Sequence, residues 1–179
     1  MKTGSAVLGG VIGALFVGHG AQKLLGKFGG HGLEGTGQFF EGALGLKPGK
    51  VHAGAAGAAE MGGGALLAAG VATPVAATAL HGTMATAIWT VHKDKGVWVS
   101  DGGYEYNVVL MAAVFALTAE REGLATALAT LAAGVAGSAA LLNVAREAPQ
   151  GSAPSEDDAQ EAPAGGEDDV DAQLLNATA

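Results

Sequence analysis

Apolar runs separated by polar connections make up most of this chain. Five runs are long enough, or nearly long enough, to cross a bilayer as helices: residues about 4–25, 52–70, 75–92, 105–118 and 124–142. The fourth is short, because a span needs roughly 20 residues. The pattern predicts an all-α, multi-pass protein embedded in the cell membrane.

The long connection at residues 26–50 has a pattern of its own. Thr36 to Leu46 is predicted to form a short helix at the membrane interface, with Phe39, Phe40 and Leu44 as its apolar face. A long loop inside a small domain is often functional. We therefore expect this connection to shape one end of the protein.

Small residues recur at four-residue spacing and predict close helix packing. The first run carries the row Ala6, Gly10, Ala14 and Gly18, and the fifth carries Gly134 and Ser138. These rows are expected to face neighbouring helices.

The composition supports a membrane protein and excludes several chemistries. Hydrophobic residues make up 49% of the chain and charged residues 15%, whereas soluble domains carry about 25% charged residues. The absence of cysteine excludes disulfides, thiolate metal sites and thiol redox chemistry. Basic residues form no stripe of the kind that binds nucleic acid.

The charge is distributed unevenly along the chain. Residues 1–147 carry nine basic and nine acidic side chains, whereas residues 148–179 carry eight acidic and no basic ones. The acidic segment is rich in Pro, Ser and Gly and is predicted to be disordered.

Basic residues concentrate in the connections 26–50 and 93–104. This bias predicts that these connections lie in the cytoplasm and that the N-terminus lies outside.

Polar side chains gather at one depth of the predicted bundle. At 1.5 Å per helical residue, His19 lies roughly 9 Å from one end of its helix and Glu60 roughly 12 Å from the same side. The candidate site at this depth comprises His19, Gln22, Lys23, Glu60, His92, Glu105 and Asn107. Ionisable groups within a membrane are costly and usually functional.

Glu60 is the one carboxylate deep within an apolar run, and it needs a partner. Depth makes His19 or Lys23 the natural partner. The pair would be either a structural clasp between helices or part of a proton-handling or ligand-binding site. His81, taken by itself, is interpreted as a core histidine that is hydrogen-bonded to a neighbouring backbone group. Metal binding by His19, Glu60 and His92 and haem ligation by two histidines rank below these readings, so no metal is predicted.

Several of these residues together resemble a known family. His19-Gly20-x-Gln22-Lys23-Leu24 followed by Phe28-Gly29-Gly30-x-Gly32 looks like the opening signature of DoxX-type membrane proteins. Further similar motifs follow in the same order: Glu60 before Gly62-Gly63-Gly64, Thr73-Pro74, His92 before Lys95-Gly96, and Gly103-x-Glu105-Tyr106-Asn107.

The resemblance implies a four-helix membrane core at residues 1–118, to which the pattern adds a further transmembrane helix at 119–147 and the acidic tail at 148–179. DoxX relatives include small subunits of a terminal quinol oxidase and proteins linked to thiosulfate and quinone chemistry. The resemblance leaves the cofactor unidentified, with quinone as a candidate, and it points to other oxidoreductase subunits as partners.

Three functions follow from these observations. The first is a redox-associated membrane subunit whose polar site handles a quinone or a proton; because nothing in the sequence carries electrons, a flavin- or haem-containing partner would supply them. The second is a non-catalytic scaffold or assembly factor for an oxidoreductase or stress-response complex. The third, a small-solute permease, ranks last because no internal repeat is visible. The sequence leaves open whether the protein is an enzyme and whether it forms a homo-oligomer.

Overall fold

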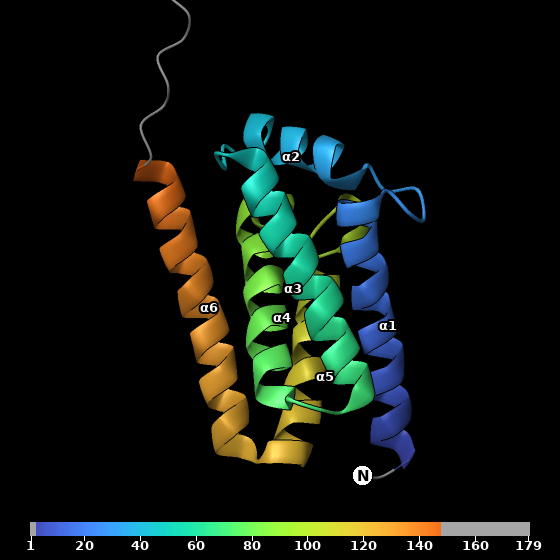
Figure 1. Cartoon of the computed structure of the whole chain (residues 1–179). Helices are drawn as coiled ribbons and strands as arrows, with labels where there is room; N and C mark the ends of the chain where they lie inside the picture. The colour runs from blue at the N-terminus through green and yellow to red at the C-terminus, as the bar shows by residue number, and fades with distance from the viewer. Residues whose placement is uncertain (1–2, 148–179) are drawn as a thin grey trace, which may run out of the picture. The chain divides into compact units, whose positions relative to one another are not determined.

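Five long helices run alternately up and down beside one another: α1 (Thr3–Leu25), α3 (Gly49–Ala69), α4 (Thr73–Ala87), α5 (Glu105–Glu122) and α6 (Leu124–Glu147) (Figure 1). The computed structural model describes residues 3–147, and this part of the chain contains helices and no strand. The predicted all-α class is confirmed. The acidic segment 148–179, predicted to be disordered, lies outside the described residues.

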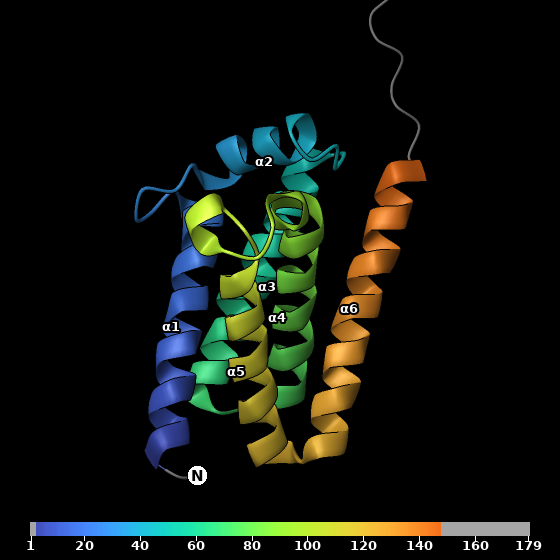
Figure 2. The ribbon, with the colours of Figure 1, turned by 180° about the vertical axis from the view of Figure 1, so that it is seen from behind.

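A short helix, α2 (Gly32–Gly42), lies across one end of the bundle over α1 and α3 (Figures 1 and 2). It begins and ends four residues before the predicted range 36–46. Gly32 has a positive φ of 66°, which lets the chain turn sharply into the helix. Leu44 therefore lies beyond the helix, and with Leu46 it joins a small apolar cluster that includes Leu142 of α6.

Two helices are long and apolar enough to cross a membrane by length and composition, Thr3–Leu25 and Leu124–Ala145. The helices between them are more polar or shorter. The α-helical part of α4 has 15 residues, although a π-helical turn, η1 (Ile88–His92), continues it. Membrane crossing by the five long helices therefore stays a prediction, which length and composition support for α1 and α6.

Glycines bring α1 and α3 into backbone contact. A Cβ added at Gly13 would lie 2.4 Å from the carbonyl oxygen of Gly64, and one at Gly20 would lie 2.6 Å from that of Gly57. Such contacts are typical of helix pairs in lipid. The prediction that the row through Gly10 packs was wrong, because an added Cβ there would meet nothing within 4 Å. Another row of the same helix, shifted around its axis, makes the contact.

The described helices differ in how they join the core. Buried side chains of α1, α3, α4 and α5, among them Phe16, Leu67, Leu80 and Leu117, form the main apolar cluster. None of that cluster comes from α6, which packs mainly against α4 and α5. As predicted, Gly134 lies at a close crossing, since its added Cβ would be 2.8 Å from the backbone nitrogen of Gly82. Helix α6 thus stands beside the bundle and leans away from α4 towards its C-terminal end (Figures 1 and 2).

Candidate functional site

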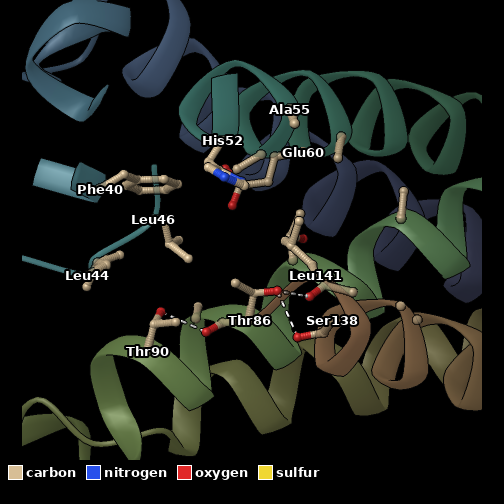
Figure 3. A pocket seen from close by; sticks show the side chains of 18 of the residues that line it. Phe40, Leu44, Leu46, His52, Ala55, Glu60, Thr86, Thr90, Ser138 and Leu141 are labelled. Atoms are coloured by element: carbon tan, nitrogen blue, oxygen red, sulfur yellow. Dashed lines mark hydrogen bonds between the residues drawn. The ribbon is translucent and has the colours of Figure 1, made fainter. Parts of the chain in front are cut away.

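A cavity of about 450 Å³ lies between α3, α4 and α6 (Figure 3). Phe40 of α2 and, from the segment that follows it, Leu44 and Leu46 cover one end of the cavity. Most of the lining is apolar, with alanines and glycines along the facing helices. The polar or titratable members of the lining are Lys23, His52, Glu60, Thr78, Thr83, Thr86, Thr90, His92 and Ser138.

Lys23 and Glu60 form an ion pair in the cavity wall. The Lys23 ammonium donates to Oε2 of Glu60 at 2.6 Å, and the two side chains are 25% and 5% exposed. Lys23 comes from the last turn of α1 and Glu60 from the middle of α3. Gly57 permits this approach, because a Cβ there would lie 3.3 Å from the Cβ of Lys23. The α1–α3 glycine contact thus places a cation beside the buried carboxylate.

His92 reaches the same cavity from the π-helical turn that continues α4. Its Nδ1 lies 2.7 Å from the carbonyl oxygen of Gly102. A carbonyl can only accept, so Nδ1 is the protonated nitrogen that donates. The remaining nitrogen, Nε2, can accept a hydrogen bond when the ring carries a single proton. Wide helical turns of this kind often occur at functional sites.

The hydroxyl groups of the cavity offer acceptors rather than donors. Thr86 donates its hydrogen to the carbonyl oxygen of Gly82 at 2.9 Å, and Thr78 and Thr90 bond back along their helix in the same way. Because a threonine has a single hydroxyl hydrogen, Ser138 is the donor in its 2.8 Å bond to Thr86. Lys23 supplies a charged donor to the lining, and the hydroxyl oxygens supply acceptors.

Four of the predicted site residues lie elsewhere. His19 Nδ1 donates to the Gln22 amide oxygen at 3.1 Å, and Gln22 donates to the carbonyl oxygen of Phe28 at 3.1 Å. These two residues hold the turn after α1 in place. Asn107 is buried and its amide approaches Met84 Sδ at 3.5 Å, and Glu105 opens α5. The structure brings Lys23, Glu60 and His92 to one cavity and does not place the other four in its lining.

His81 is completely buried between helices, and its ring lies 3.3 Å from the carbonyl oxygen of Met111. The core-histidine reading of this residue is confirmed. Among residues 3–147, no three His, Asp or Glu side chains come together as metal ligands.

The sequence reasoning missed the contribution of α6 to the cavity. Gly137, Ser138 and Leu141 form one wall, and Leu142 packs against the residues that cover the end. A signal was present in the sequence. Ser138 is a lone hydroxyl in an apolar run, and Thr86 of α4 and Thr90 of η1 are four residues apart, at helical spacing.

The two long apolar helices are compatible with a helical membrane protein. A family model described as DoxX matches residues 7–93, so this part of the chain is a DoxX domain, which supports a DoxX-family protein. The match runs from α1 through η1 and leaves out α5 and α6. No curated protein and no solved structure matches this chain.

Proposed function

We propose that this DoxX-family membrane protein is a redox-associated subunit that binds a quinone-like lipid in the cavity between α3, α4 and α6. The observation that carries the proposal is the Lys23–Glu60 ion pair in the wall of an otherwise apolar cavity. Pockets for small lipophilic molecules are mostly apolar, carry a few placed polar groups and measure roughly 300–1,000 Å³. At about 450 Å³, this cavity suits a quinone ring with the first part of its tail.

The polar groups match both redox forms of such a ligand. The Lys23 ammonium donates to a quinone carbonyl oxygen, and Glu60 or His92 accepts from a quinol hydroxyl. Reducing a quinone to a quinol takes up a pair of electrons and a pair of protons. The electrons would come from a flavin- or haem-containing partner subunit, and the chain's own groups would orient the ring and exchange its protons.

In this proposal the protein is multi-pass in the cell membrane, with the α2 end facing the cytoplasm. That orientation rests on the basic residues of the connections 26–50 and 93–104.

The absorption spectrum and extracted lipids of the purified protein test the proposed quinone binding first. Recovery of a quinone supports it. Failure to retain or bind any quinone would leave the scaffold as the better account of the protein.

A variant that fills the cavity is expected to lose quinone binding and keep the fold. Gly137 lines the cavity, and a Cβ added there meets nothing within 4 Å, so Gly137→Phe places its ring in the cavity without a backbone clash. Binding is measured as photolabelling by a quinone that carries an azide and an isoprenoid chain, with the protein in phosphatidylcholine–phosphatidylglycerol liposomes.

The matched control is Gly62→Phe. Gly62 is also a helical glycine with open space around an added Cβ, but it lies outside the cavity lining. This variant is expected to label like the wild type. Equal labelling of Gly137→Phe and Gly62→Phe would show that the quinone binds somewhere other than this cavity.

A further inference from the structure

Helix α6 differs from the other walls of the cavity in how it is attached. Helix α3 packs mainly on α1, α2 and α4, whereas α6 packs mainly on α4 and α5. The cavity separates α3 from α6. Much of the lining that these two helices contribute is small: Ala55, Ala56 and Ala59 on α3, and Ala133, Gly134 and Gly137 on α6. The larger lining residues are His52 and Glu60 on α3 and Leu141 on α6.

The α1–α3 side of the bundle offers a contrast. There the glycine contacts bring backbone against backbone, with an added Cβ at Gly64 only 2.6 Å from the carbonyl oxygen of Gly13. A molecule cannot pass between helices that touch in this way. Of these two sides of α3, only the one facing α6 has small side chains around open space.

The connections of α6 allow movement about its N-terminal end. A single residue, Gly123 with a φ of 90°, separates α5 from α6. The close crossing at Gly134 holds the first half of α6 against α4. On the C-terminal side of Gly134, the side chain of Ser138 hydrogen-bonds to that of Thr86 on α4. Within the described residues on that side of Gly134, this is the side-chain hydrogen bond that joins α6 to another helix. One such bond between helices in lipid is weak.

The far end of α6 is held by a small apolar cluster. Leu142 and Ala145 pack against Leu46, with Phe40 and Leu44 alongside. Phe40 of α2 and the loop residues Leu44 and Leu46 also cover the end of the cavity nearest α2 (Figure 3). This cover lies between the cavity and the α2 end of the bundle, so a ligand coming from water on that side would have to displace it.

We propose that the C-terminal half of α6 is a movable side wall, and that the lipid ligand reaches the cavity from the bilayer between α3 and α6. This inference rests on the proposed function, and it adds that residues outside the family match complete the site. It also selects among ligands: a long-chain membrane-resident quinone can leave its tail in the α3–α6 gap, whereas a water-soluble solute has no such route.

A reversible crosslink tests the movable wall. The Thr86 and Ser138 hydroxyl oxygens are 2.8 Å apart, so Thr86→Cys/Ser138→Cys places two thiols within bonding reach. The chain has no other cysteine, so the disulfide is the only one that can form. Oxidation is expected to slow photolabelling by the azido isoprenoid quinone at least several-fold, and a reductant is expected to restore the rate.

The oxidised and reduced forms of one protein are each other's control. Equal labelling rates in the two forms would overturn the movable wall, while labelling itself would keep the proposed function. Absence of labelling in the wild type would overturn both. A rate that falls only in the oxidised form supports the inference and cannot result from a general loss of fold.

A second measurement does not depend on disulfide formation. Spin labels at the exposed positions Ala58 of α3 and Ala140 of α6 report the distance across the gap. Their distance distribution is expected to shift when the isoprenoid quinone is added to quinone-depleted protein. Labels at Ala58 and the exposed Ala14 of α1 form the control pair, which should not shift. An unchanged Ala58–Ala140 distribution on binding would contradict the proposal.

Discussion

Replacing Lys23 with methionine is expected to lower the free energy of unfolding by a large amount. The substitution leaves the Glu60 carboxylate, only 5% exposed, without its cation. Removing one partner of a buried ion pair typically costs roughly 3–5 kcal/mol, and the 25% exposure of Lys23 places this site towards the lower end. Thermal unfolding in detergent, followed by circular dichroism, measures the loss.

The reverse substitution provides a comparison within the pair. Glu60→Met leaves Lys23 without its carboxylate partner. Because the Lys23 side chain is longer and more exposed, its ammonium can reach water, so the loss of unfolding free energy should be smaller than for Lys23→Met. The double variant Lys23→Met/Glu60→Met removes both charges and should recover most of the stability. A Glu60→Met variant less stable than Lys23→Met would contradict this assignment of the buried charge.

The same double variant separates the two readings of the ion pair. If the pair binds the quinone, the stable double variant loses photolabelling. If the pair is a structural clasp alone, the double variant labels like the wild type. Stability and labelling are measured on one preparation, so loss of the fold cannot be mistaken for loss of the site.

Replacing Gly13 with leucine is expected to prevent the bundle from assembling. The Cβ alone would lie 2.4 Å from the Gly64 carbonyl oxygen and 2.8 Å from the Ala68 backbone nitrogen. Neither atom belongs to a flexible side chain, so α1 and α3 must separate. Overpacking a well-packed interface costs about 1–3 kcal/mol, and more where the backbone must move. The yield of monodisperse protein and its unfolding temperature measure the effect.

Gly10→Leu on the same helix is the matched control. An added Cβ at Gly10 meets nothing within 4 Å, and leucine favours a helix over glycine by nearly 1 kcal/mol in water. This variant is expected to be as stable as the wild type or slightly more so. Equal damage from Gly10→Leu and Gly13→Leu would mean that the other glycine row makes the contact.

Helix formation could be predicted because its cause is local. Apolar runs bounded by Gly and Pro predicted segments close to α1, α3 and α4, whereas α5 and α6 continue beyond the predicted ends, to Glu122 and Glu147. The predicted range for α2 was four residues too late. The helix begins at Gly32, whose positive φ turns the chain into it, and hydrophobic patterning does not reveal such a turn. The choice between the Gly10 and Gly13 rows was missed because both rows place small residues at helical spacing, three or four residues per turn or seven per two turns.

The site could be predicted only in part, for a related reason. Depth along a helix follows from residue number, so Lys23 was a foreseeable partner for Glu60, and the structure shows their ion pair. Rotation about the helix axis depends on packing between helices. His19 lies on the next turn of α1 from Lys23 and turns instead to Gln22, whereas Asn107 packs against Met84.

The sequence by itself determined that this is a helical protein suited to a membrane, with a DoxX signature and a buried carboxylate that needs a cation. Tertiary structure alone decided which polar groups share a cavity, and that α6 closes one of its sides. The physical reason is that backbone hydrogen bonding and burial in lipid act within each segment. The rotation and tilt of helices instead follow from contacts between residues far apart in the chain, such as Gly13 with Gly64 and Thr86 with Ser138.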